Sequence, residues 1–201
     1  MLVIGLTGGV GSGKTTVSEF LQELGAVVLD ADRVGHESYL PNTPAWKDIV
    51  ETFGQDLLLP SQEIDRKKLG SIVFNDPADL AKLNSIVHPR MRGMMQEQLN
   101  DLASKGAETV VLEAAILIEA GWVPLVDEVW ATEAGEEAVI DRLHRRNNWP
   151  EDQIRDRIRA QLPSAERAAQ AQVVINTDCT LDEVKQKVSV LWETRVVKRT
   201  G

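Results

Sequence analysis

The chain has 201 residues, of which 43% are hydrophobic and 26% charged, a balance typical of a folded globular protein. Its formal net charge of −9 argues against a protein that coats nucleic acid, because binding along a phosphate backbone needs a basic face. No apolar run approaches the roughly 20 residues of a membrane-spanning helix, and the single cysteine, Cys179, excludes an internal disulfide framework. We therefore expect a cytoplasmic protein, a monomer or weak homo-oligomer, that binds neither nucleic acid nor membrane.

Short apolar runs that end at turn residues are typical of buried strands, and five of them occur along the chain. They cover residues 2–6, 26–32, 109–117, 126–132 and 172–176. Helical patterns separate these runs, so that strands and helices alternate. This alternation predicts a five-stranded parallel sheet with helices on both faces, which is a three-layer α/β fold.

Two long helical stretches interrupt the alternation. Residues 33–105 contain several helical patterns and no convincing strand, and residues 136–170 are helical and rich in arginine. We expect one domain over residues 1–201, with a helical insertion at 33–105 and a helical lid at 136–170. Its core would then comprise residues 1–32, 106–135 and 171–201.

The first loop has the composition of a phosphate-binding loop. In "GLTGGVGSGKTT" the spacing Gly8-x-x-x-x-Gly13-Lys14-Thr15 matches the Walker A pattern, between an expected strand and an expected helix. Glycines let backbone N–H groups converge on phosphate, and the helix dipole adds to the attraction. We expect ATP bound as its Mg²⁺ complex, with Lys14 on the phosphate oxygens and the Thr15 hydroxyl on the metal. The expected contacts are Gly11, Ser12, Gly13, Lys14, Thr15 and Thr16.

The loop indicates a nucleoside triphosphate but leaves the reaction open. We find neither an Asn-Lys-x-Asp guanine-reading motif nor a D-x-x-G switch in a suitable place, which argues against a GTPase. A helical insertion combined with an arginine-rich region is typical of a small-molecule kinase whose lid excludes water. A kinase for another hydroxyl acceptor and a nucleotide-dependent switch that only signals to a partner remain the alternatives.

"DAD" at the end of the second expected strand supplies a candidate base. If the strand continues to its last residue, Asp30 and Asp32 point to the same side. A carboxylate at the carboxyl edge of a sheet lies where α/β folds bind ligands, and Asp32 could accept a proton from an acceptor hydroxyl. The alternative is that Asp32 caps the helix that begins at "RVGHESYL".

Several segments resemble the dephospho-CoA kinase family. "GLTGGVGSGKTT", "DADRVGHE", "IDRKKLGSIVF" and "LNSIVHPRMR" occur in that order and at similar spacing. "EAAILIEAGW" and "RLHRRNNWPEDQIRDRIRAQL" continue the likeness, and these two look closer to the kinase half of the animal bifunctional CoA synthase. The resemblance implies transfer of the ATP γ-phosphoryl group to the ribose 3′-hydroxyl of dephospho-CoA, the last step of coenzyme A synthesis.

On the acceptor side, the resemblance implies that Asp32 is the catalytic base. His88, in the His88-Pro89 pair, would help to hold dephospho-CoA; the following proline by itself predicts only that His88 is extended. Arg66 and Lys67 would meet the substrate's pyrophosphate, although a solvated basic face explains them equally well.

In the expected lid, Arg142 and Arg146 match the family's "RL-x-x-R" pattern, and Arg157 and Gln161 match "R-I-x-x-Q". An arginine directed at the γ-phosphate stabilises the transition state, so we expect Arg146 and then Arg142 to be catalytic. We expect the other arginines of the region to be solvated helix charges. They are Arg145, Arg155, Arg157, Arg159 and Arg167.

Two positions, Glu113 and Asn176, leave a role open, and a third, Glu119, matches the family pattern. Glu113 stands where an acid would orient magnesium-bound water, but a charge that caps the strand is an equal alternative. Glu119 matches the family glutamate that ends this motif, and "INTD" replaces the usual "I-D-N", which weakens a base contact from Asn176. The C-terminal "VVKRTG" is expected to be a solvated tail.

Overall fold

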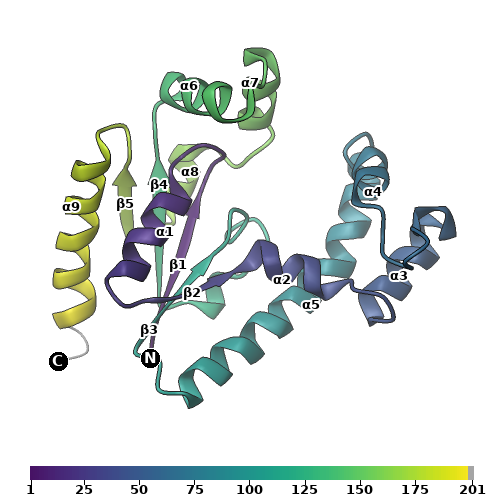
Figure 1. Ribbon diagram of the computed structural model, residues 1–201, viewed down its shortest axis with the longest axis horizontal. Coiled ribbons are helices and arrows are strands. Elements are labelled where there is room, and N and C mark those ends of the chain that lie inside the picture. Colours follow the sequence, from purple (N-terminus) through teal and green to yellow (C-terminus); the bar gives the residue numbers. More distant parts are fainter. Residues whose placement is uncertain (199–201) are drawn as a thin grey trace. The chain divides into compact units, whose positions relative to one another are not determined.

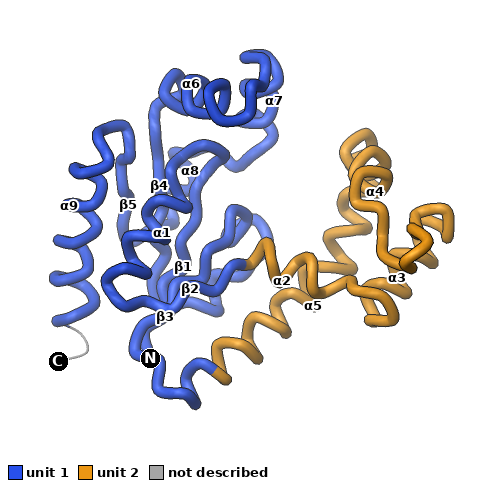
Figure 2. The backbone as a smooth tube through the Cα atoms, in the orientation of Figure 1, with its two compact units in different colours: residues 1–30, 102–201 blue, residues 31–101 orange. Residues whose placement is uncertain are grey.

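The computed structural model describes residues 1–198. The chain forms two compact units, one from Met1–Asp30 with Leu102–Gly201 and the other from Ala31–Asp101 (Figure 2). All strands of the described residues lie in the first unit, and the second is built from helices. Residues 199–201, which belong to the predicted solvated tail, lie outside the described part of the chain.

A five-stranded parallel sheet forms the centre of the first unit (Figure 1). Its strands are β1 (Leu2–Gly8), β2 (Val27–Asp30), β3 (Thr109–Glu113), β4 (Glu128–Glu133) and β5 (Val173–Asn176). Their order is β2-β3-β1-β4-β5, and every neighbouring pair is parallel. The predicted sheet is thereby confirmed, with β3 rather than β2 beside the strand that carries the phosphate loop.

The second strand is shorter than predicted. β2 ends at Asp30, and helix α2 (Ala31–Ser38) follows directly. Ala31, Val34 and Ser38 are buried, and this spacing of three and four residues is that of a helix face. The prediction of a strand over 26–32 is wrong at its end, so Asp30 and Asp32 do not share one face of a strand.

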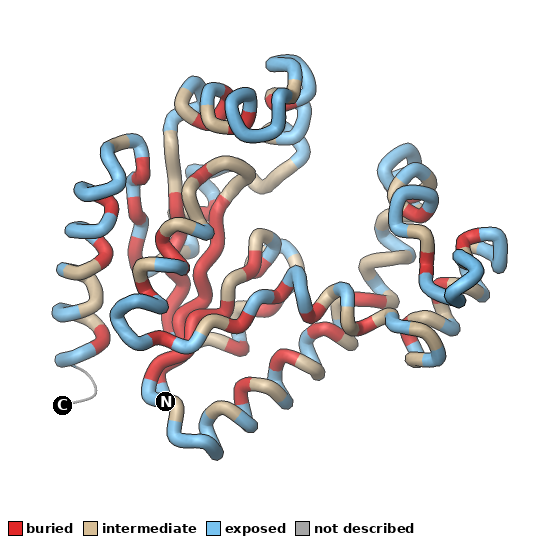
Figure 3. Tube along the Cα trace, viewed as in Figure 1, coloured by how far each residue is buried: buried red, intermediate tan, exposed pale blue. Residues whose placement is uncertain are grey.

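Side chains of β1 alternate between the two faces of the sheet, as the period of a strand requires. Leu2, Ile4 and Leu6 belong to one core cluster, together with residues of α1 (Lys14–Glu23) and α9 (Leu181–Leu191). On the opposite face, a Cβ at Gly5 would come within 2.6 Å of Leu117. The three central strands, β1, β3 and β4, are therefore covered on both sides, and Figure 3 shows them as continuously buried, whereas the edge strands β2 and β5 carry exposed residues.

Three helices occupy the region of the predicted lid: α6 (Glu136–Asn147), α7 (Glu151–Arg159) and α8 (Ser164–Ala169). Val139, Ile140, Leu143 and Ile154 give α6 and α7 a small core of their own. Helices α6 and α7 therefore pack through a cluster distinct from the one under the sheet.

The C-terminal segment contradicts part of the predicted solvated tail. After α9 the chain continues as a π-helical turn, Trp192–Val197, in which Val196 is 2% exposed and joins the core cluster of β1. The Arg195 Nε donates to the Glu128 carboxylate over 3.2 Å. Burial of one apolar side chain and this ion pair hold the segment against the sheet.

The second unit contains α2, α3 (Pro44–Phe53), α4 (Arg66–Val73) and most of α5 (Pro77–Ser104), with a 3-10 turn at Gln55–Leu57. Pro89 lies inside α5, so the preceding His88 is helical and the prediction of an extended residue is wrong. The Arg90 guanidinium donates to the Ile86 carbonyl over 2.7 Å and also pairs with Asp48. Pro89 lacks the N–H that would bond to the Ser85 carbonyl, and Arg90 adds a side-chain bond to the next carbonyl along the helix.

Candidate active site

The loop between β1 and α1 has a backbone that only glycines adopt readily. Gly11 and Gly13 have φ values of 71° and 83°, in the left-handed region. At Gly8 a Cβ would lie 2.0 Å from the Thr132 Oγ1, which leaves no room for any side chain. The glycine spacing recognised in the sequence is thus required by conformation and by close packing.

Polar side chains from distant segments hold this loop in place. The Ser12 and Thr132 hydroxyls lie 2.7 Å apart, and the Thr177 hydroxyl donates to the Ser12 carbonyl over 2.8 Å. The Gln161 side chain accepts the Val10 N–H over 2.8 Å. Gln161 is the glutamine of the "R-I-x-x-Q" pattern, whereas no local signal identifies Thr132 or Thr177 as loop contacts.

Lys14 begins α1 and pairs with Glu113 at the end of β3. The Nζ–Oε1 distance is 2.6 Å, and the two side chains are only 14% and 12% exposed. Because β3 is the immediate neighbour of β1, its last residue lies beside the loop. Thr15 is exposed in the first turn of α1, and Thr16 is half-buried. An ammonium and a carboxylate thus meet at the loop, and an exposed hydroxyl follows the lysine in sequence.

The two arginines expected to act in catalysis have different surroundings. Arg142 donates from Nη1 to the Gly11 carbonyl over 3.2 Å and from Nη2 to the Thr177 carbonyl over 2.5 Å. These bonds tie α6 to the phosphate loop. Arg146, one turn further along α6, is exposed, and its Nε donates to the Asn147 side chain over 3.0 Å.

Most other arginines of this region are at the surface, as predicted, but Arg167 is not. Arg167 is only 3% exposed, and its Nη2 atom lies 3.6 Å from the Glu119 carboxylate. Expecting a solvated charge there was wrong, because α8 packs against β4 and carries the side chain inward. Arg155 is half-buried among three glutamates, which raise the pKa of its guanidinium. Arg157 lies over the Trp149 ring, 4.2 Å from its centroid.

Asp32 lies in the first turn of α2, two residues after β2 ends. The carboxyl end of β2 is at the same edge of the parallel sheet as the phosphate loop, since the loop follows the carboxyl end of β1. Asp32 is exposed. An exposed carboxylate that follows this edge is suited to meet a ligand.

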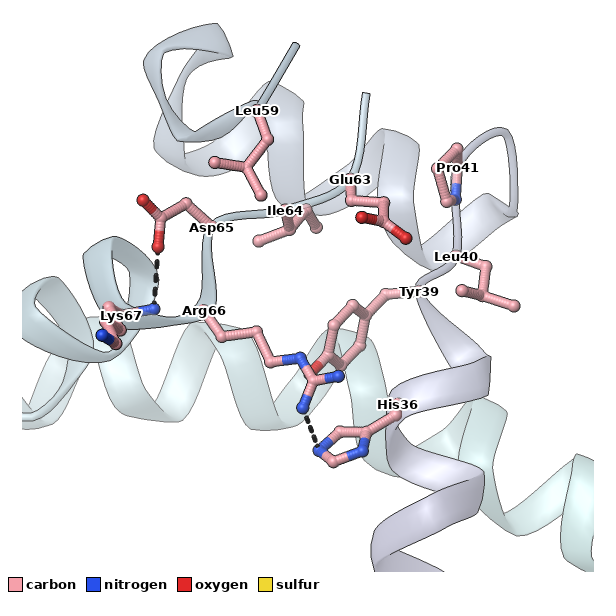
Figure 4. A pocket seen from close by; sticks show the side chains of 10 residues that line it. All are labelled: His36, Tyr39, Leu40, Pro41, Leu59, Glu63, Ile64, Asp65, Arg66 and Lys67. Carbon is pink, nitrogen blue, oxygen red and sulfur yellow. Dashed lines mark hydrogen bonds between the residues drawn. The ribbon is translucent and has the colours of Figure 1, made fainter. Parts of the chain in front are cut away.

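The second unit has a cavity of about 310 Å³ that contains the basic pair predicted from "DRKKLG" (Figure 4). Its lining comprises His36, Tyr39, Leu40, Pro41, Leu59, Glu63, Ile64, Asp65, Arg66 and Lys67. Arg66 Nη1 donates to His36 Nε2 over 2.6 Å, and the Asp65 carboxylate caps α4 by accepting the Lys67 N–H over 3.0 Å. Burial raises the pKa of the Tyr39 hydroxyl, and the Arg66 charge partly offsets the rise. The cavity is therefore lined by cationic, anionic, aromatic and apolar side chains together.

His88 does not line this cavity, although it belongs to the same unit. Its ring is half-buried in α5, and burial lowers the pKa of the imidazole below its usual value. His88 is therefore not part of the cavity that Arg66 and Lys67 line.

Residues 1–198 contain neither a cluster of metal-ligating side chains nor a helix that could span a membrane. Within this range, no group of three or more His, Cys, Asp or Glu side chains is placed to hold a metal ion. No helix in the same range has both the length and the hydrophobicity needed to cross a bilayer.

The chain is similar to known proteins over almost its whole length. A family described as dephospho-CoA kinase matches residues 2–183. A dephospho-CoA kinase of Geobacter sulfurreducens is 42% identical, with 97% of this chain and 99% of the relative aligned. One from Streptomyces avermitilis is 43% identical over 96% of this chain and 93% of the relative. Both are bacterial, and the closer likeness of two segments to the animal synthase stays a prediction.

Solved structures give the same result for the fold. The crystal structure of TT1252 from Thermus thermophilus superimposes with a TM-score of 0.81 at 29% identity, covering 96% of this chain and 97% of that one. A shikimate kinase from Bacteroides thetaiotaomicron has a TM-score of 0.57 at 16% identity, with 96% and 98% covered, and shows similarity of fold alone.

Proposed function

We propose, since the chain belongs to the dephospho-CoA kinase family, that it transfers the γ-phosphoryl group of ATP to the ribose 3′-hydroxyl of dephospho-CoA. The products are coenzyme A and ADP, and the reaction completes coenzyme A synthesis. The observation that carries this proposal is the glycine loop with Lys14 between β1 and α1, in a chain that matches the family over residues 2–183.

On the donor side, the loop binds the triphosphate. Backbone N–H groups of residues 11–16, in the loop and the first turn of α1, donate to phosphate oxygens, except the Ser12 N–H, which donates to the Gly9 carbonyl over 3.1 Å. Lys14 supplies a cation. The triphosphate competes with Glu113 for that ammonium, because the two side chains pair over 2.6 Å. Arg146, exposed on α6, is the lid cation that balances charge on the transferring group.

Magnesium fits the donors at this loop. The exposed Thr15 hydroxyl and the Glu113 carboxylate are hard oxygen ligands, suited to hold the ion directly or through water. When bound, Mg²⁺ neutralises negative charge on the phosphate oxygens.

On the acceptor side, Asp32 is the general base. Its carboxylate accepts the proton of the 3′-hydroxyl as that oxygen attacks the γ-phosphorus, and the bond from the γ-phosphorus to the β–γ bridging oxygen breaks to release ADP. The exposure of Asp32 and its place just after β2 support this role.

The helical insertion, residues 33–105, binds dephospho-CoA. Arg66 and Lys67 supply two cations at the cavity of the second unit, which matches a substrate with a pyrophosphate and a long apolar arm. His88 contributes a second contact elsewhere on the insertion. Residues 136–170 close as a lid, which keeps water from the γ-phosphate. The enzyme works in the cytoplasm as a monomer or weak homo-oligomer.

The test is ATP-dependent conversion of dephospho-CoA to coenzyme A by the purified protein, with the product identified by mass. One phosphate should be gained per molecule, and it should be located at the 3′ position by a 3′-nucleotidase. Shikimate is a matched negative acceptor, because a shikimate kinase shares the fold. Formation of ADP at the same rate with and without dephospho-CoA would refute the proposal and favour a nucleotide switch.

A further inference from the structure

Arg167 differs from every other arginine of the lid region. Its side chain is 4% exposed, whereas the remaining arginines of residues 136–170 are exposed or half-buried. It extends from α8, a helix that packs against β4 and follows the rest of the lid. A guanidinium inside the protein needs several acceptors to compensate for its lost hydration.

Those acceptors are missing within residues 1–198. The Nε and Nη2 atoms of Arg167 are buried, and the described residues provide neither with a hydrogen-bond partner. The nearest carboxylate oxygen, on Glu119, is 3.6 Å from Nη2. A charge-assisted hydrogen bond is about 2.7–2.9 Å long, so this ion pair leaves the guanidinium underpaired.

The guanidinium lies against the first turn of the phosphate loop. Its Nη1 is 3.6 Å from the point that a Cβ on Gly9 would occupy, and the Gln161 Oε1 is 3.3 Å from the same point. Gln161 itself accepts the Val10 N–H over 2.8 Å. Two polar side chains from the end of the lid region therefore border the Gly9–Val10 turn, one of them an underpaired cation.

A purely structural role does not account for this placement. Replacing a buried ion pair by apolar side chains of similar size is often neutral or stabilising, so packing alone gives no reason for an arginine here. Phosphate oxygens are the acceptors that suit a guanidinium best. We propose that Arg167 is a second cation of the phosphate loop, which donates to phosphate oxygens of the bound triphosphate. The inference rests on the proposed function only in placing ATP at this loop.

The test compares Arg167→Met and Arg167→Lys with the wild-type protein, and uses Arg159→Met as the matched control. Arg159 is a surface arginine of α7 paired with Asp156. Two quantities are measured: the dissociation constants of a non-hydrolysable ATP analogue and of AMP by calorimetry, and the melting temperature without ligand. Neither requires turnover.

We expect Arg167→Met to melt near the wild-type temperature, because Glu119 is 29% exposed and only loosely paired at 3.6 Å. It should bind the ATP analogue roughly ten- to hundredfold more weakly. AMP affinity should change little, Arg167→Lys should bind the ATP analogue with intermediate strength, and Arg159→Met should match the wild type. An ATP-analogue affinity of Arg167→Met within twofold of the wild type would overturn the proposal. So would equal losses for the ATP analogue and AMP, because these indicate a distorted loop.

If Arg167→Met does not fold, the Arg167→Lys variant tests the proposal in its place. A folded lysine variant with wild-type affinity for the ATP analogue contradicts donation by the guanidinium, and a weakened affinity at an unchanged melting temperature supports it. A wild-type protein that binds ATP but makes no coenzyme A would contradict the proposed function and leave the result for Arg167 standing.

Discussion

Lys14 and Glu113 form a short ion pair at the phosphate loop, 2.6 Å from nitrogen to oxygen, with little exposure of either side chain. Removal of either charge destabilises the folded protein, because the remaining charge is then buried without a partner and poorly hydrated. The lysine is expected to bind the triphosphate, so its contributions to stability and to affinity need separate measurement.

Lys14→Met should lower the free energy of unfolding by about 1–3 kcal/mol, since Glu113 loses its cation. It should also weaken ATP binding roughly hundredfold. The double variant Lys14→Met with Glu113→Gln should recover stability and still bind ATP weakly. Denaturant unfolding and calorimetry measure the two effects. If the double variant regained ATP affinity, Lys14 would not be a phosphate contact.

Asp32→Asn should bind ATP normally and lose about 10²- to 10⁴-fold in turnover, because an amide does not accept the proton of the acceptor hydroxyl. Turnover is followed by coupled detection of ADP, and ATP affinity by calorimetry. The neighbouring surface carboxylate Glu37, at the other end of α2, serves as the control through Glu37→Gln. Near-normal turnover of Asp32→Asn would remove the base assignment.

At the scale of an element, the long helix α5 continues through a proline in its interior. Pro89 is inside the helix, and the Arg90 side chain donates to the Ile86 carbonyl nearby. This places His88 within a helix, half-buried, with the pKa of its imidazole lowered by burial.

The lowered pKa of His88 makes stability depend on pH. The unfolded state binds the proton more readily than the folded state, so the free energy of unfolding is at its full value above about pH 6.5 and declines as the pH falls toward the folded pKa of His88. His88→Gln should reduce this decline between about pH 7 and 5 while leaving stability at pH 8 nearly unchanged. Urea unfolding of both proteins at each pH measures the free energy of unfolding. An equal pH dependence in both proteins would show that His88 ionises alike in the two states.

At the scale of the whole molecule, the sheet unit is discontinuous in sequence. Its first part is Met1–Asp30 and its second is Leu102–Gly201, with the helical unit between them. Leu2 and Ile4, near the N-terminus, share a core cluster with Val196, near the C-terminus. The two ends of the chain therefore stabilise the unit jointly.

Val196→Ala should lower the free energy of unfolding by roughly 1–3 kcal/mol, because the buried side chain leaves a cavity. Its neighbour Val197 is 52% exposed, and Val197→Ala should change stability by less than about 0.5 kcal/mol. Denaturant unfolding of the two variants gives the comparison. Equal effects of the two substitutions would contradict an anchoring role for the C-terminal segment.

The sequence alone determined the class of fold and the phosphate loop. Strand and helix periodicities, the glycine spacing before Lys14 and the similarity of several motifs are all local signals, each contained within a few residues. A left-handed φ at Gly11 and Gly13, for example, follows from the demands of one turn. The roles of Asp32, His88, Arg66 and Lys67 stay predictions.

Only the tertiary structure decided which side chains meet. β3 lies between β2 and β1, which brings Glu113 to Lys14 across 99 residues of sequence, and Gln161 reaches Val10 across 151. The end of β2 at Asp30 and the burial of Arg167 likewise depend on what packs against them. Periodicity reports which way a residue faces along its own element, whereas pairing and burial depend on neighbours that folding brings from distant parts of the chain.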